Sequence, residues 1–321
     1  MRNALAVVVL VCLSGIMAQA ADNSGGLPPL MQRFPKQTLV YFECPDLSAS
    51  RAAIENTAFG KIWAEPELQA FGQPMMERFT QLKNRLSDVL GVSLDAFAAL
   101  GAKRFAAGLI VTDLEHAPSM RLIADCPDAP SAGAVGAALS ALINGLAKRG
   151  NTLLAPAVMQ GDTTVQPLGD GLNLSWRLRG PAIIVTLAKG GTPAESVAVT
   201  PGATLADVPC MTGARAAIDK GAVDIFLGNA TGFWALLREE AGKNGEAAAA
   251  MPVLDALGLT GMESMAMGVA VTEPGFSTRV FLGVPERKGV FSLFQEASVS
   301  PEILAAVPAN VNCMKAMRFA L

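Results

Sequence analysis

The sequence contains very little histidine and few aromatic residues. His116 is the single histidine in 321 residues, and aromatic residues make up 6%. A serine or cysteine triad with a histidine base would have to use His116. This residue stands in the segment Asp113–Pro118, which predicts an exposed turn between two strands. We therefore expect His116 to be a solvated loop residue.

The common motifs for metals and nucleotides are also missing. No histidine or cysteine pair has the spacing of a zinc site, and no P-loop occurs. Gly169–Gly171 and Gly190-Gly191 are not placed between a strand and a helix as in a nucleotide-binding turn. Gly261–Ser264 lacks the second glycine of a nucleophile elbow. The sequence predicts no catalytic residue, no cofactor-binding residue and no metal-binding residue.

The chain has no basic surplus. It carries 25 Lys and Arg against 28 Asp and Glu, and no basic stripe with interleaved aromatics is present. A nucleic-acid partner is therefore not expected. After residue 20, no segment is apolar enough to span a bilayer. We expect no transmembrane segment in the mature chain.

Residues 1–20 have the pattern of a signal peptide. Arg2 is the positive residue, Leu5–Met17 is apolar, and Ala18-Gln19-Ala20 is a cleavage site. The pattern predicts export to the periplasm or the extracellular space, with cleavage near Ala20. Val11 precedes Cys12 where a lipoprotein needs a small residue, so lipidation is not expected.

The remaining chain predicts an α+β fold with two related units of antiparallel strands backed by helices. Residues 21–36 are rich in Gly and Pro and predict a flexible leader. Residues 37–150 form the first predicted unit, 151–212 a connecting β-meander, and 213–321 the second unit.

In the first unit, Thr38–Glu43 is rich in β-branched and aromatic residues and predicts a strand. Asp46 is expected to cap a helix that ends near Thr57. Apolar residues recur every three or four positions over Leu68–Val89, which predicts an amphipathic helix lying on the sheet. A second helix is predicted over Ser131–Arg149, with Ser131 as its cap.

The meander is predicted from three apolar segments separated by glycine turns: Thr163–Leu168, Leu172–Leu178 and Ala182–Ala188. Apolar and polar residues alternate in the middle segment, which predicts one buried and one solvated face of an antiparallel sheet. Arg177 and Arg179 lie on its polar side, where they either hold an anion or simply face solvent.

The second unit repeats the layout of the first. Ala222–Leu227 predicts a strand, Thr231 is expected to cap the next helix, and Ser264–Glu286 predicts a hairpin with a turn at residues 273–275. The segments 103–113 and 119–128 have the same order of strand, connection and strand, so we predict an internal duplication. A final strand is predicted over Val311–Leu321.

Four cysteines remain after signal cleavage, and an exported protein can hold disulfides. Cys44 and Cys126 each begin a Cys-Pro-Asp sequence after a predicted strand, so they are expected near each other. The alternative is that the cysteines are buried thiols. The four residues are Cys44, Cys126, Cys210 and Cys313.

The remaining polar and methionine residues have ordinary structural explanations. Glu65 and Glu67 flank Pro66 at a predicted helix start and favour the helix dipole rather than acid–base catalysis. Asp46 and Asp128 are expected to be helix caps. The methionines of the second unit are expected to fill the core, although Met also lines adaptable apolar pockets.

Several segments resemble a family of exported bacterial proteins of unknown function. They are residues 38–47, the run from Thr57 to Phe71, Gly289–Phe294 and residues 301–308. The resemblance covers most of residues 34–321, and it implies that the chain is a shortened member. It supplies no catalytic residue.

These observations favour a non-catalytic extracytoplasmic binding or structural module, with an unidentified protein partner. The alternative is a periplasmic carrier of a small hydrophobic or lipid ligand. A third possibility is an enzyme with an unfamiliar site.

Overall fold

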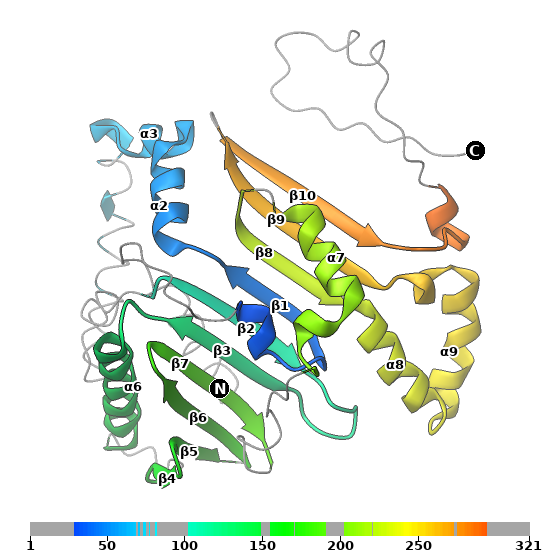
Figure 1. The fold of residues 1–321 in the computed structure, drawn as a ribbon, viewed down its shortest axis with the longest axis horizontal. Coiled ribbons are helices and arrows are strands. Elements are labelled where there is room, and N and C mark those ends of the chain that lie inside the picture. The colour runs from blue at the N-terminus through cyan, green and yellow to red at the C-terminus, as the bar shows by residue number, and fades with distance from the viewer. Residues whose placement is uncertain are drawn as a thin grey trace, which may run out of the picture.

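The computed structural model describes residues 29–68, 102–148, 155–169, 171–190, 202–219, 221–272 and 275–293, together with single positions between 70 and 81. These residues form an α+β fold around one ten-stranded antiparallel sheet (Figure 1). The strand order is β10-β9-β8-β1-β2-β3-β7-β6-β5-β4. Both predicted units and the meander therefore contribute to the same sheet.

The strands have the following bounds: β1 Thr38–Cys44, β2 Arg104–Ile110, β3 Ser119–Asp125, β4 Val158–Gln160, β5 Thr163–Gly169, β6 Leu172–Arg179, β7 Ala182–Lys189, β8 Ala222–Asn229, β9 Ser264–Thr272 and β10 Gly275–Gly283. Strand β1 lies inside the sheet, paired on one side with β2 and on the other with β8. The predicted meander strands and the predicted hairpin at Ser264–Glu286 are confirmed.

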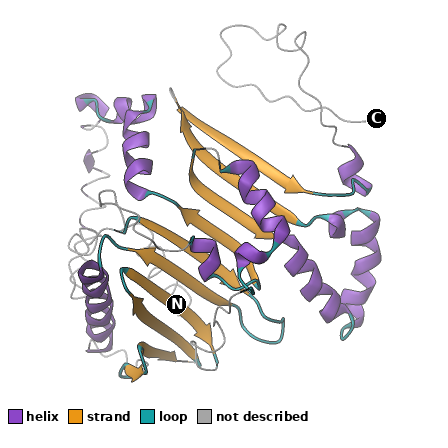
Figure 2. Cartoon of the chain, viewed as in Figure 1, coloured by secondary structure: helices purple, strands orange, loops and turns teal. Residues whose placement is uncertain are grey.

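The helices have the following bounds: α2 Leu47–Asn56, α3 Ala58–Trp63, α6 Ala129–Lys148, α7 Pro209–Ile218, α8 Ala230–Ala241 and α9 Gly245–Ala256, with short 3-10 turns η1 Leu30–Arg33, η2 Leu205–Asp207, η3 Leu259–Gly261 and η4 Gly289–Leu293. Figure 2 shows that the helices lie around and over a continuous strand layer. Most of the amphipathic helix predicted over Leu68–Val89 falls outside the described residues, and the positions described within it are helical. The strand predicted over Val311–Leu321 falls outside them entirely.

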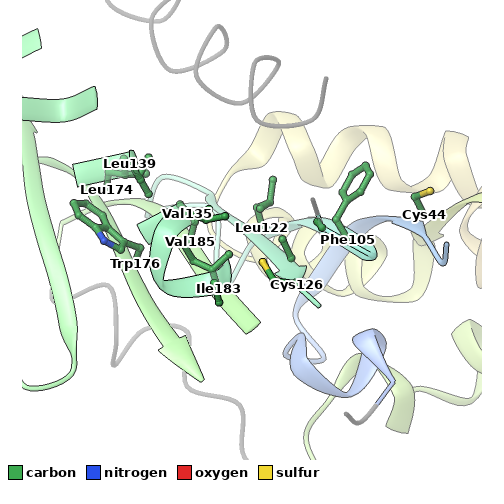
Figure 3. Close-up of a cluster of buried hydrophobic side chains, with 13 residues drawn as sticks. Cys44, Phe105, Leu122, Cys126, Val135, Leu139, Leu174, Trp176, Ile183 and Val185 are labelled. Atoms are coloured by element: carbon green, nitrogen blue, oxygen red, sulfur yellow. The ribbon is translucent and has the colours of Figure 1, made fainter. Parts of the chain in front are cut away.

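The two faces of the sheet carry separate cores. On the face that we call the α6 face, Leu122 and Val185 pack with Leu139 of α6 (Figure 3). On the opposite face, which we call the α7 face, Tyr41 and Leu227 pack with η1 and α7. Neighbouring residues of one strand alternate between the two cores, as the geometry of a strand requires.

The first and second predicted units share an arrangement. In each, one strand is followed by helices and then by a hairpin, giving β1-β2-β3 and β8-β9-β10 as sets of neighbours. The two sets meet where β1 pairs antiparallel with β8. A common origin of the two sets stays a prediction.

Two predicted helix caps are wrong by two or three positions. Helix α8 is capped by Asn229, whose side-chain oxygen accepts a hydrogen bond from the N–H of Gly232. The hydroxyl of Thr231 instead donates to the carbonyl of Glu263. Helix α6 begins at Ala129, and Asp128 accepts the N–H of Ser131. The expected caps Asp46 and Asp128 are confirmed.

The prediction of one solvated face on β6 is only partly correct. Ser175 and Thr186, on the polar side, are both buried, while Arg179 at the strand end is exposed. The reason is tertiary, since Ser175 and Thr186 line a small cavity on the α7 face together with Arg121 of β3. Alternation correctly identified the faces but not what lies over them.

Cys44, Cys126 and Cys210 are free thiols. Cys44 and Cys126 both belong to the core beneath α6 (Figure 3), as expected from their shared sequence setting. However, Cys44 ends β1 and Cys126 follows β3, with β2 between them. Strands two apart are separated by about 10 Å, which is too far for a disulfide. Cys313 falls outside the described residues.

Candidate functional site

Two cavities lined by described residues are considered, and the larger of these two lies where the β9–β10 hairpin ends beside helix α7. Its volume is about 460 Å³, within the range of small-molecule sites. The lining residues come from three places: the first half of α7, the start of β9 with the residue before it, and the chain from β10 to η4. They include Cys210, Gly213, Glu263, Phe281, Arg287 and Phe291.

Small residues leave this space open. A Cβ at Gly213, in the middle of α7, would meet no atom within 4 Å. At Gly283 a Cβ would collide with the hydroxyl of Ser264, so a larger residue there would have to displace that hydroxyl. The cavity therefore depends on a helix that presents only small residues towards it and on a strand that stays close to its neighbour.

The walls are mainly apolar and the rim is charged. Phe281 and Phe291 contribute aromatic surface, while Glu263 and Arg287 add charges of both signs. The Cys210 thiol donates to the carbonyl of Glu263 at 3.6 Å, and burial raises its pKa. A thiol that stays protonated is a poor nucleophile.

Two glycines hold the outer wall in place. Gly258 has φ of 76° and Gly289 has φ of 55°. The backbone of Gly258 lies close to that of Lys288, and the backbone of Gly289 lies close to that of Leu257. The N–H of Val290 donates to the carbonyl of Leu257 at 2.9 Å. This contact fixes η4, and with it Phe291, beside the end of β10.

A second, much smaller cavity lies on the α7 face between β3, β6 and β7. Its volume is about 10 Å³, and its lining includes Arg121, Thr163, Ser175, Arg177 and Thr186. Arg179, the other arginine that the sequence pattern singled out, is not part of it. Arg179 pairs with Asp162 at 2.9 Å.

The α6 face is covered at one end of the sheet and exposed at the other. Strand register places Val280, Met267, Phe226, Phe42, Ala107, Leu122 and Val185 in one row across it. Leu122 and Val185 are buried beneath α6, but Met267 is 41% exposed and Val280 is 65% exposed. Three further apolar side chains of the β9–β10 end are also exposed: Met265, Phe276 and Leu282.

The three residues considered for catalysis, His116, Glu65 and Glu67, lie at exposed positions. His116 is exposed, as expected, and its ring Nδ1 lies 2.8 Å from Asp113 Oδ1. The backbone N–H and then the ring of His116 hold the pKa of Asp113 below its ordinary value. Among the described residues, the contacts of this ring include no serine or cysteine. Glu65 and Glu67 are both exposed.

Sequence reasoning missed most of the larger cavity. It allowed only that methionines of the second unit could line an apolar pocket, and most of the cavity's lining residues belong to that unit. It singled out methionines, but Met265 and Met267 point to the exposed α6 face instead. Phe281, Glu263 and Cys210 carried no local signal because they converge from three separate segments.

Within the described ranges, no group of three or more His, Cys, Asp or Glu side chains is placed to hold a metal ion. The part of the chain that the structure describes contains no helix long and apolar enough to cross a membrane. Comparison of the chain with protein-family models, with curated proteins and with solved structures found no match. The resemblance to an exported bacterial family therefore stays a prediction.

Proposed function

We propose that this protein is a non-catalytic, exported binding protein that holds a small ligand with an apolar body in the cavity between α7 and the end of the β9–β10 hairpin. The cavity itself is the observation that carries the proposal. Its volume of about 460 Å³ suits a small organic molecule. Export is supported by the signal-peptide pattern of residues 1–20.

The lining favours an amphipathic ligand. An apolar body would replace water against Phe281 and Phe291, and burial of apolar surface is favourable by roughly 25 cal/mol per Å². A polar end would remain at the rim, near Glu263. Because the Cys210 thiol is protonated and hydrogen-bonded, the bound molecule would leave unchanged.

The test is to fill the cavity. Gly213→Leu places a side chain where a Cβ meets open space, and leucine is a better helix former than glycine by nearly 1 kcal/mol. We expect this variant to fold at least as well as the native chain and to lose at least tenfold in affinity for the neutral apolar fluorophore N-phenylnaphthylamine. Native mass spectrometry of protein purified from the periplasm checks for a molecule carried from the cell.

Two variants serve as controls. Gly133→Leu makes the same change on α6, where a Cβ also meets open space, and should keep dye binding. Val280→Lys alters the exposed α6 face and should also keep it. Dye binding that survives Gly213→Leu but is lost in Val280→Lys would overturn the cavity as the binding site.

A second candidate function is assembly with a protein partner through β10. This strand has a neighbour on one side only among the described strands, and its side chains Phe276, Val280 and Leu282 are exposed. An open edge beside exposed apolar side chains suits an extended segment of a partner, added as a further strand.

A photo-crosslinking residue at Thr278 or Val280 tests this second candidate in the periplasm. Crosslinks from both positions to alternate residues of one segment in another protein would support strand addition. Crosslinks confined to this chain's own residues 68–89, the predicted amphipathic helix, would contradict it.

A further inference from the structure

Two arginines from separate strands share the small cavity on the α7 face. Arg121 on β3 lies opposite Thr186 on β7, which in turn lies opposite Ser175 on β6. Arg177 follows Ser175 by two positions, so it projects from the same face. Both side chains line the cavity of about 10 Å³, which has room for one particle of about the size of a water molecule.

The charge around this cavity is positive. No carboxylate is among its lining residues, which are two arginines, three hydroxyl residues, Trp176 and Ile184. Arg121 is only 4% exposed. Burial and then the charge of Arg177 lower the pKa of Arg121 to about 10. Two like charges held close together where water is scarce repel each other strongly.

The nearby carboxylate is engaged elsewhere. Asp162 pairs with Arg179 at 2.9 Å and accepts from the hydroxyl of Thr163 at 3.1 Å. Arg177 forms no ion pair with a carboxylate among the described residues. The Nη1 of Arg121 donates to the carbonyl of Arg33 at 2.8 Å, which fixes the guanidinium at the sheet surface.

We propose that Arg121 and Arg177 bind one small monovalent inorganic anion, of the chloride class, between β3, β6 and β7. The anion offsets the repulsion between the two guanidinium groups and accepts hydrogen bonds from the side chains around it. The site stabilises the contact between the first three-stranded set and the meander. The anion site is separate from the larger cavity, so this proposal does not depend on whether that cavity binds a ligand.

The experiment compares chloride with gluconate, an anion too large for the cavity, at constant ionic strength. For the native protein, replacing gluconate by chloride should lower the unfolding equilibrium constant about tenfold when chloride exceeds its dissociation constant about tenfold. Arg177→Met should abolish this chloride-specific effect. In gluconate this variant should be at least as stable as the native chain, because the repulsion is gone.

Arg179→Met is the matched control, since Arg179 stands on the same strand and face but pairs with Asp162. It should keep the chloride effect. Crystals grown with bromide should show an anomalous peak between the two guanidinium groups. Equal stability in chloride and gluconate, or a chloride effect that persists in Arg177→Met, would overturn the proposal and leave the cavity to a water molecule.

Discussion

Arg215 on α7 and Glu43 near the end of β1 form a bidentate ion pair, although 172 positions separate them in the sequence. Glu43 is 3% exposed and also accepts the hydroxyl of Tyr41 at 2.6 Å. The pair joins a helix of the second predicted unit to the central strand of the sheet. It therefore fixes α7, one wall of the larger cavity, in position.

Removing one partner of this pair should destabilise the fold. Arg215→Met leaves the Glu43 carboxylate buried without its counter-charge, and we expect a loss of about 3 kcal/mol in the free energy of unfolding measured with urea. Arg51→Met, which breaks an exposed pair with Glu55, should cost at most about 0.5 kcal/mol. Similar losses in the two variants would show that burial does not strengthen the Arg215–Glu43 pair.

Tyr41, the single tyrosine, reports on the same network. Burial and then the neighbouring Glu43 raise the pKa of Tyr41 well above 10.0. The protonated phenol is thus favoured in the folded state, so this contribution to stability is complete below pH 10 and is lost as the pH rises further. A spectrophotometric titration should show no phenolate until the protein unfolds.

Tyr41→Phe provides the control for that titration. It keeps the ring in the core but removes the bond to Glu43, and should cost about 2 kcal/mol at neutral pH. Its stability should depend less steeply on pH above 10 than that of the native chain. Phenolate appearing in the folded native protein near pH 10 would contradict the burial of Tyr41.

The two core thiols should be unreactive in the folded protein. Burial raises the pKa of Cys44 and of Cys126 from 9.0 to about 11. At pH 8 a thiol reagent should modify the partly exposed Cys210 much faster than either core thiol, as measured by peptide mapping. Rapid modification of Cys44 or Cys126 without unfolding would be inconsistent with the core beneath α6.

The same shifts set an alkaline limit on stability. Because both folded-state pKa values are raised, the thiols stabilise the fold fully below pH 9, and this contribution disappears as the pH rises through 11. The loss is on the order of 3 kcal/mol for each thiol. The Cys44→Ala, Cys126→Ala double variant should show a flatter decline of unfolding free energy between these pH values.

Gly289→Ala should open the outer wall of the larger cavity. A Cβ at this position would collide with the backbone of Leu257, and φ of 55° disfavours any other residue. We expect η4 to shift and the affinity for N-phenylnaphthylamine to fall severalfold. Gly161→Ala has a similar φ of 61° but open space around its Cβ, so it should lose about 1 kcal/mol of stability and keep dye binding.

Local elements could be predicted because their signals act within a few residues. Asp46 caps α2 by accepting the N–H of Ala49, three positions away, and the β9–β10 hairpin pairs Thr272 with Gly275. One of the two wrong cap predictions, Thr231, has a nonlocal cause. The hydroxyl of Thr231 is taken by the carbonyl of Glu263, 32 positions later.

The sites could not be predicted in the same way. Arg177 was recognised as a possible anion ligand, but its counterpart Arg121 lies on β3, and only the order β3-β7-β6 brings them together. The larger cavity likewise needs α7, β10 and η4 to meet. The spacing of these residues along the chain does not predict that the three segments pack together.

The α+β class, most of the strands and the absence of the familiar catalytic motifs can be read from the sequence alone, because periodicity and turn residues depend on neighbours along the chain. Tertiary structure decided that β1 lies beside β8 within one sheet, that Arg215 pairs with Glu43, and that one end of the α6 face stays exposed. Those outcomes depend on which strand edges and helix faces pack together, and packing is decided by contacts between residues far apart in sequence.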